Sequence, residues 1–272
     1  MKKKFNEGVT VGLPYHRATP IEFFFEALNS IINQTYPITH IHIIIDGPIK
    51  EKHLHQIIDK KKKHNNISII KIKKQHGLPH AINCSIKRTK TTFYARMDSD
   101  DISHPERIMK QVNYLNHHPS VMAVGTWAKT FTNKTSDSLD TIKTPTRFID
   151  IKKATHYRSP MVHPTVLFRT CIFYNVGLYN EKYLRAQDLE LWGRFLNKNI
   201  KIANIAEPLL YLRSNNVLSR RASIDAIRYQ MLARLTYKTK SPVLFTLKLA
   251  SVFFRLLPQS AQRKMYKIRD SI

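Results

Sequence analysis

Three carboxylates stand within four positions of one another in a chain that is poor in acidic residues. They are Asp98, Asp100 and Asp101 in the run Arg96-Met97-Asp98-Ser99-Asp100-Asp101, and only 19 of the 272 residues are Asp or Glu. Carboxylates this close repel one another unless a cation lies among them. Mg²⁺ and Mn²⁺ bind such groups through one or two oxygens and leave other positions to water and phosphates. The cluster therefore predicts a site for a divalent ion and a diphosphate.

The segments on either side of the acidic cluster indicate where it lies. Thr92-Phe93-Tyr94-Ala95 is typical of a buried strand, and Ser103-His104-Pro105-Glu106 has the capping-box pattern of a helix start. Open α/β sheets bind their ligands where the carboxyl ends of the strands meet. We therefore expect the carboxylates at that edge of a sheet.

The first 120 residues alternate predicted strands with predicted helices. Strands are expected over residues 9–13, 41–45, 67–72 and 92–97. Helices are expected over residues 20–34, where Thr19-Pro20-Ile21-Glu22 forms another capping box, and over 54–63, 79–87 and 108–116. This alternation predicts a mostly parallel sheet covered by helices on both faces. Tyr15, Asp46, Gly77 and the acidic cluster would then share one edge.

The second half of the chain gives a weaker pattern. Strands are expected over residues 121–131 and 163–169, a turn at Gly177, and a short helix over 188–196 with Asp188 near its start. Residues 132–155 are polar and fit no periodic pattern. From residue 223 onward the chain is predicted to be helical. The apolar face expected there consists of Phe245, Leu249, Val252, Phe253 and Leu256.

The composition describes a strongly basic protein. Lys and Arg number 45, which gives a formal net charge of +26, so nucleic acid, anionic lipid headgroups and phosphate-bearing substrates are all candidate partners. The two cysteines, Cys84 and Cys171, have neither metal-ligand nor redox spacing, which indicates a reducing compartment and a cytoplasmic location. The longest apolar stretch, residues 242–257, contains Lys248 and Arg255 and is not expected to span a membrane.

Several motifs, in this order, resemble the family 2 glycosyltransferases of the GT-A fold, in the bacterial branch that builds exopolysaccharide, lipopolysaccharide and capsule. The motifs are GLPYHRATPIEFFFEALNSIINQTYP, IIIDGP, GLPHAIN, ARMDSDDISHPERIMKQVNYL, HPTVLFR, AQDLELWGRFL and YLRSNNVLSRR. The resemblance implies a Rossmann-like, mostly parallel central sheet flanked by helices, with a basic helical tail at the C-terminus. Residues 1–221 would be the catalytic domain, with a nucleotide-sugar half at 8–120 and an acceptor half at 121–221. Residues 222–272 would be an amphipathic helical segment.

The resemblance also implies a role for each matching residue. Residues expected to bind the nucleotide-sugar are Pro14, Tyr15, Asp46, Gly77, Arg96 and Asp98. Metal binding would fall to Asp98 and Asp100, and Asp188 would be the catalytic base. Residues expected to contact the acceptor or support the site are Asp101, His163, Gln187 and Glu190. Gln187 replaces a glutamate that is common before the base, and the absence of a Gln-x-x-Arg-Trp motif favours a single-addition enzyme over a polymerase.

The activity implied is the transfer of a sugar, with inversion and with Mn²⁺ or Mg²⁺, from a nucleotide-sugar such as a UDP-sugar to a lipid-linked oligosaccharide or lipopolysaccharide. The basic tail would hold the protein peripherally on the anionic inner face of the cell membrane, or its apolar face would instead pack on the catalytic domain. Two alternatives remain open, a basic nucleic-acid-binding protein and a sugar nucleotidyltransferase. Nucleic acid is not expected as a partner of the transferase. Taken alone, Asp46 and Asp188 also fit ordinary turn and helix-start residues, and His163 fits a packing residue.

Overall fold

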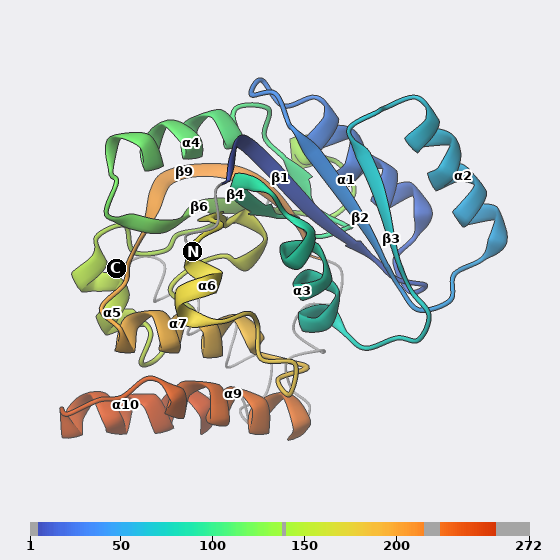
Figure 1. Cartoon of the computed structure of the whole chain (residues 1–272). Helices are drawn as coiled ribbons and strands as arrows, with labels where there is room; N and C mark the ends of the chain where they lie inside the picture. Colours follow the sequence, from blue (N-terminus) through green and yellow to red (C-terminus); the bar gives the residue numbers. More distant parts are fainter. Residues whose placement is uncertain (1–4, 138–139, 215–223, 254–272) are drawn as a thin grey trace.

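The computed structural model describes residues 5–137, 140–214 and 224–253 (Figure 1). Its first half alternates strands and helices. The strands are β1 (Asn6–Tyr15), β2 (His40–Asp46), β3 (Ile67–Ile72) and β4 (Thr91–Arg96), and the helices are α1 (Ile21–Ile32), α2 (Glu51–Lys62) and α3 (Leu78–Arg88). β1 pairs in parallel with β2 and β4, and β2 pairs in parallel with β3. The predicted parallel sheet is confirmed, and the carboxyl ends of these four strands meet at one edge.

The second half of the chain extends this sheet with strands of mixed direction. Its elements are β5 (Ile102–Ser103), α4 (Arg107–His117), β6 (Val121–Phe131), β7 (Thr141–Ile142), α5 (Phe148–Ala154), β8 (Leu167–Arg169), α6 (Ile172–Val176), α7 (Gln187–Asn197) and β9 (Lys201–Arg213). The strand order is β3-β2-β1-β4-β8-β6-β9-β5, with β7 beside β6. β8 is antiparallel to both β4 and β6, whereas β9 is parallel to β6. The predicted α/β class is confirmed.

Alternating side chains of the strands supply a core on each face of the sheet. Val11 and Leu13 of β1 pack with Phe24 and Leu28 of α1 in one cluster. On the other face, Tyr94 of β4 packs in a second cluster with residues of α3, α6 and α7. This period of two follows from the strand geometry, in which successive side chains point to opposite faces. The helices therefore cover both faces, as Figure 1 shows.

Two C-terminal helices form a further layer beneath α7 (Figure 1). They are α9 (Ile224–Thr236) and α10 (Pro242–Phe253). Gly193 of α7 allows the end of α9 to come close, since a Cβ there would lie 3.1 Å from the backbone nitrogen of Tyr237. The Asn197 side chain donates to the carbonyl of Thr236 at 2.7 Å and accepts from the amide of Lys238 at 3.0 Å. The junction between α9 and α10 is thus fixed to α7.

Three local predictions differ from the structure. Both capping boxes are wrong, because α1 and α4 begin without a side-chain cap. The hydroxyl of Thr19 instead contacts Ser99 of the acidic loop, at 3.2 Å, and Ser103 accepts from Gln34. The strand predicted from residue 163 begins only at Leu167, because a 3₁₀ turn, η2 (His163–Thr165), precedes it.

The apolar face predicted for the C-terminal segment is divided in the structure. Val252 is buried and Leu249 is half-buried, whereas Phe245 and Phe253 are exposed. Leu256 lies outside the described residues. Among the helices that the structure describes, none combines the length and the apolarity needed to cross a bilayer.

Candidate active site

The acidic loop follows β4 directly, at the edge where the parallel strands end. Carboxylate oxygens of Asp98, Asp100 and Asp101 all lie within 4.8 Å of one another. Asp98 and Asp100 are half-buried, and Asp101 is 2% exposed. Local chain geometry brings the three together because β4 ends at Arg96 and the chain turns before β5. The predicted cluster is therefore one compact group of oxygen ligands.

Arg96 is the cation closest to this group in sequence and it contacts the group in space. Its side chain is 2% exposed and forms an ion pair with Asp98. Burial acts to lower the pKa of the guanidinium, but the charge of Asp98 and its hydrogen bond raise the pKa overall. The buried guanidinium fixes the position of the Asp98 carboxylate at the sheet edge.

Asp101 is the most deeply buried of the three carboxylates. One oxygen, Oδ1, accepts the backbone amide of Arg213 at 3.0 Å, whereas Oδ2 has no hydrogen-bond partner among the described residues. Burial, followed by the negative charges of Asp98 and Asp100, raises the pKa of Asp101 well above its usual value. A buried carboxylate oxygen without a donor, beside two further carboxylates, is the environment that a hard divalent cation satisfies. The residues present therefore fit a Mg²⁺ or Mn²⁺ ion.

Arg213 is a site residue that the sequence prediction missed. Its Nε donates to the carbonyl of Asp100 at 2.9 Å, and its guanidinium pairs with Glu26. The guanidinium carbon lies 3.8 Å from the ring centroid of Phe23 and 4.5 Å from that of Phe131. The only sequence signal was its place in the YLRSNNVLSRR motif, which gave no indication that it contacts the acidic loop.

A second buried arginine lies behind the acidic loop. Arg107, at the start of α4, is fully buried and donates to the carbonyl of Pro164 at 2.8 Å. Burial lowers the pKa of Arg107 to about 9, and the negative charge of Asp101 acts in the opposite direction. This residue was also not predicted. Together with Arg96 it adds positive charge close to the three carboxylates.

Asp46, the last residue of β2, is hydrogen-bonded to the loop that follows the neighbouring strand β3. Its two carboxylate oxygens accept the backbone amides of His76 and Gly77 at 2.9 and 2.8 Å. Gly77 has a φ of +94°, which a residue with a Cβ adopts only with strain, and a Cβ there would lie 3.2 Å from Leu184. Asp46 and Gly77 are therefore brought together as expected, and the loop that precedes α7 lies against them.

Pro14 and Tyr15 end β1 on the same edge. Tyr15 is fully buried, and its hydroxyl forms a 2.9 Å hydrogen bond with Nδ1 of His53 on α2. Its ring lies 4.6 Å from that of Phe24. The side chain of Tyr15 therefore holds the end of β1 between α1 and α2.

Asp188 lies in the first turn of α7, as predicted. Its side chain is half-buried, whereas the neighbouring Gln187 is buried. Ala186, immediately before the helix, has a φ of +57°, in the left-handed region that a non-glycine residue seldom adopts. Strained backbone of this kind persists where the surrounding structure enforces it, and it is common at functional sites. The helix N-terminus favours the ionised form of a first-turn carboxylate.

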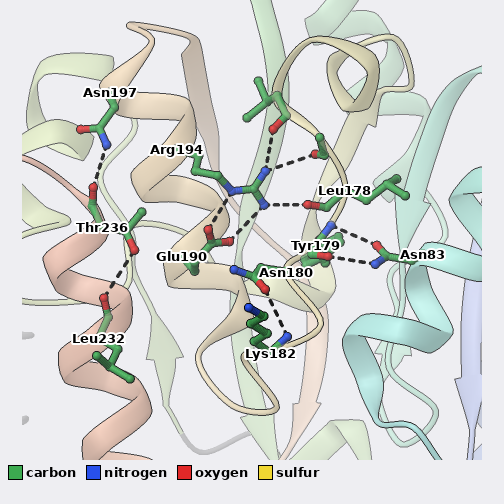
Figure 2. A network of polar contacts seen from close by, with 12 residues as sticks. Asn83, Leu178, Tyr179, Asn180, Lys182, Glu190, Arg194, Asn197, Leu232 and Thr236 are labelled. Carbon is green, nitrogen blue, oxygen red and sulfur yellow. Dashed lines mark hydrogen bonds and ion pairs between the residues drawn. The ribbon is translucent and has the colours of Figure 1, made fainter.

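Glu190 and Arg194 form an ion pair on α7 that supports the preceding loop (Figure 2). Glu190 is 4% exposed, and its carboxylate accepts Nε and Nη2 of Arg194 at 2.8 and 3.0 Å. The same guanidinium donates to the carbonyls of Val176 and Leu178, each at 2.7 Å. The pair thereby attaches the turn at residues 176–178 to α7.

Tyr179, in the loop before α7, is bound to His163 of η2 and was not predicted from the sequence. Its hydroxyl forms a 2.8 Å hydrogen bond with Nε2 of His163. Burial and then the positive charge of Arg96 lower the pKa of His163 well below its usual value. Burial raises the pKa of Tyr179 well above its usual value, and the charges of Arg96 and Asp188 both act on it. The phenol therefore lies within electrostatic range of the acidic loop and of the predicted base.

The segment before α7 is held against α3 by Asn83. The Asn83 side chain accepts the amide of Tyr179 at 3.0 Å and donates to its carbonyl at 2.9 Å, as Figure 2 shows. Glu181 accepts a further bond from Asn83 at 2.8 Å and pairs with His80 of α3, also at 2.8 Å. These contacts fix the start of α7 relative to the parallel half of the sheet.

Comparison with known proteins relates this geometry to a family. Residues 10–181, well over half of the chain, match Glycosyl transferase family 2. An Escherichia coli protein named UDP-Gal:alpha-D-GlcNAc-diphosphoundecaprenol beta-1,3-galactosyltransferase is 29% identical over 93% of this chain and 92% of its own. The amylovoran biosynthesis glycosyltransferase AmsE of Erwinia amylovora is 26% identical over 93% of this chain and 95% of its own.

A solved structure shows the same fold at low sequence identity. The mannosyltransferase PcManGT from Pyrobaculum calidifontis, in complex with GDP-Man and Mn²⁺, superposes with a TM-score of 0.66 at 13% identity. The alignment covers 93% of this chain and 71% of that chain. The similarity in fold extends over both halves of the sheet.

Proposed function

The chain belongs to glycosyl transferase family 2, and we propose that it is a metal-dependent, inverting enzyme that transfers a sugar from a UDP-sugar to a lipid-linked glycan. Because the chain belongs to this family and has relatives in surface-glycan biosynthesis, the protein is a nucleotide-sugar glycosyltransferase of that kind of pathway. These findings do not favour the nucleic-acid-binding and nucleotidyltransferase alternatives. UDP is proposed because the E. coli relative is named for a UDP-sugar donor.

Three carboxylates whose oxygens lie within 4.8 Å of one another support the metal-dependent mechanism. One of them has a buried oxygen that lacks a hydrogen-bond donor among the described residues. Asp98, Asp100 and Asp101 would hold the ion, which when bound supplies a Lewis acid for the departing diphosphate. Arg96 fixes Asp98, and Arg213 holds the backbone of the loop. The mannosyltransferase with the same fold is described with Mn²⁺, which supports the choice of metal.

The nucleotide is proposed to lie along the carboxyl edge of β1, β2 and β4. Pro14, Tyr15, Asp46 and Gly77 border the region for the nucleoside, and Arg96 contributes through Asp98. The Asp46 carboxylate is occupied by two backbone amides, so it shapes the loop at His76 and Gly77 that would receive the base. Gly77 allows the φ of +94° that this loop adopts next to Asp46.

Asp188 is proposed to remove the proton from the acceptor hydroxyl. A base at the first turn of α7 is held by its helix, and an in-line attack from the side opposite the diphosphate inverts the anomeric carbon. Glu190 is proposed to support this helix start through its ion pair with Arg194, and Gln187 is proposed to do so next to the base. His163 binds the hydroxyl of Tyr179. Residues 8–120 and 121–221 would then contribute the donor and acceptor sides, with residues 222–272 as the tail.

The membrane is the proposed working location. A net charge of +26 attracts the chain to anionic lipid, and a lipid-linked acceptor lies at that surface. We place the protein peripherally on the cytoplasmic face. The E. coli relative is named for a diphosphoundecaprenol-linked acceptor, which supports this choice.

Thermal unfolding with UDP or GDP, each with and without Mn²⁺, tests the donor site, because a ligand that binds only the native state raises the melting temperature. We expect a metal-dependent shift with UDP. A transfer assay with UDP-sugars and a polyprenyl-diphosphate sugar follows, with the anomeric configuration of the product read by NMR. A larger shift with GDP would replace the proposed donor, and full activity in EDTA would refute the metal.

A further inference from the structure

Each of the two C-terminal helices directs one cation inward. Arg234 of α9 is 3% exposed and donates to the carbonyls of Thr155, His156 and Tyr157 at 3.1, 3.1 and 3.2 Å. Lys248 of α10 is 2% exposed and donates to the carbonyl of Tyr237. Both charges are therefore satisfied by backbone oxygens inside the protein. A helix that faces water on its outer side normally directs such residues outward.

The same two helices have a set of large apolar side chains exposed to solvent. We call it the α9–α10 surface, and it consists of Leu232, Leu235, Val243, Phe245, Leu247 and Phe253. Their exposed fractions run from 43% for Leu232 and Leu247 to 67% for Val243. Six large apolar side chains left exposed on two neighbouring helices indicate a surface that binds a membrane or another protein.

The charges next to this surface indicate whether its partner is a membrane or another protein. Arg228, Lys238 and Lys240 are exposed on or between the two helices, and Asp225 is the one acidic residue in the described span 225–253. A second copy of the chain docked here would bring like charges together, which is unfavourable. Anionic headgroups would meet the cations, while the apolar side chains enter the boundary between headgroups and acyl chains.

We propose that the α9–α10 surface is the membrane-docking face of the enzyme and that its occupant is an anionic lipid bilayer. This inference rests on the proposed function in one respect, since a lipid-linked acceptor gives the docking its purpose. The hydrogen bond of Asn197 with Thr236 (Figure 2) attaches the end of α9 to α7. Gly193 allows the same close approach, and the first turn of α7 carries Asp188. Docking on this face therefore fixes the proposed base relative to the bilayer.

Flotation of the full chain with vesicles tests the proposal. The vesicles contain phosphatidylcholine with or without phosphatidylglycerol. We compare the wild type with Val243→Glu/Leu247→Glu and with the control Tyr174→Glu, which changes a 55% exposed side chain on α6. The double variant is expected to lower the bound fraction about tenfold or more, because two charges would enter the apolar boundary. The control is expected to bind like the wild type.

A second variant tests the charges. Lys238→Gln/Lys240→Gln is expected to weaken binding to phosphatidylglycerol vesicles by roughly fivefold per lysine and to reduce the salt dependence. Binding of Val243→Glu/Leu247→Glu at the wild-type level would overturn the proposal. A wild-type chain that binds neither kind of vesicle would also overturn the proposal. So would a wild-type dimer, detected by light scattering, that is lost in the double variant, because the surface would then bind a second copy of the chain.

The donor site supplies the control for folding and separates the two proposals. Each variant is expected to keep the wild-type stabilisation by UDP with Mn²⁺, because the changed side chains are exposed and lie on α10, between α9 and α10 or, in the control, on α6. A chain that binds vesicles through this surface but responds to no nucleoside diphosphate would refute the proposed function alone. A chain that binds UDP yet floats independently of these residues would refute the docking face alone.

Discussion

The backbone amide of Arg213 donates to the carboxylate of Asp101 across 112 positions of sequence. This contact joins the end of β9 to the loop after β4, so the last strand in the sequence borders the proposed metal site. The Arg213 side chain adds a hydrogen bond to the carbonyl of Asp100. The proposed donor half of the chain thus depends on the proposed acceptor half for the shape of its acidic loop.

Asp100→Ala is expected to lower the transfer rate by about a hundredfold or more, because a metal supplies several kcal/mol of charge stabilisation and each 1.4 kcal/mol is about tenfold in rate. The initial rate of sugar transfer measures it, alongside Mn²⁺-dependent stabilisation by UDP, which should be lost. Asp59→Ala removes an exposed carboxylate on α2 and serves as the control. A D100A enzyme with wild-type turnover would exclude this carboxylate from the metal site.

Arg213→Lys is expected to raise the Mn²⁺ concentration needed for half-maximal activity, because lysine keeps the charge but cannot reproduce the planar guanidinium contacts with Asp100, Phe23 and Phe131. Arg169→Lys is the matched control. Arg169 also contacts a ring, that of Phe93, and a carbonyl, that of Leu115, but away from the acidic loop. Equal metal requirements in the two variants would show that Arg213 serves stability alone.

Glu190→Gln is expected to reduce the free energy of unfolding by about 3 kcal/mol, because Arg194 would lose the carboxylate that balances its charge. Urea unfolding measures the loss. The double variant Glu190→Gln/Arg194→Gln should be less destabilised than the sum of the single variants, since the two side chains form one network. Strict additivity would mean that the ion pair does not support the turn at residues 176–178.

Tyr179→Phe is expected to cost about 1 kcal/mol of stability, as one buried hydrogen bond to His163 is lost. Its kcat should fall by roughly tenfold, because the hydroxyl on which the charges of Arg96 and Asp188 act is removed. Tyr114→Phe, on α4, is the control. If kcat is unchanged while stability falls, Tyr179 acts only in packing.

Stability is expected to fall as the pH decreases from about 6.5 to about 4. Burial and then the charge of His40 lower the pKa of His42 to about 4, whereas an unfolded histidine titrates near 6.5. The unfolded state therefore binds more protons in this window, so the free energy of unfolding drops by up to about 1.4 kcal/mol per pH unit from this residue. Urea unfolding at several pH values measures the slope. His42→Gln should flatten it, and an unchanged slope would assign it to other groups.

The parallel half of the fold was predictable because its signals are local. The β-branched run at residues 41–45 and the alternation of strands and helices identify β1 to β4, and with them the edge that carries Asp46 and the acidic cluster. The two capping boxes were wrong because Thr19 and Ser103 form tertiary hydrogen bonds with Ser99 and Gln34. A local pattern does not reveal that competition.

The residues that were missed have partners far away in sequence. Arg213 reaches Asp101, and Tyr179 bonds to Asn83, 96 positions earlier. Neither contact has a spacing that a sequence pattern could show. The apolar face of the C-terminal segment was misassigned for a related reason. Lys248 donates to the carbonyl of Tyr237 and points inward, so the buried side of α10 differs from the side that the apolar periodicity predicted.

The thickness of the α9–α10 layer sets the distance between α7 and the surface proposed to meet the bilayer. Packed helices lie about 8–10 Å apart, so one helix layer separates α7 from the face proposed to meet the bilayer. A layer of fixed thickness would act as a ruler, because an acceptor hydroxyl reaches Asp188 only when its lipid anchor holds it near that height. Short saccharides close to the diphosphate would match it, and longer chains would extend past it. If the α9–α10 surface meets the bilayer, this geometry would favour acceptors that carry a short saccharide next to the lipid diphosphate.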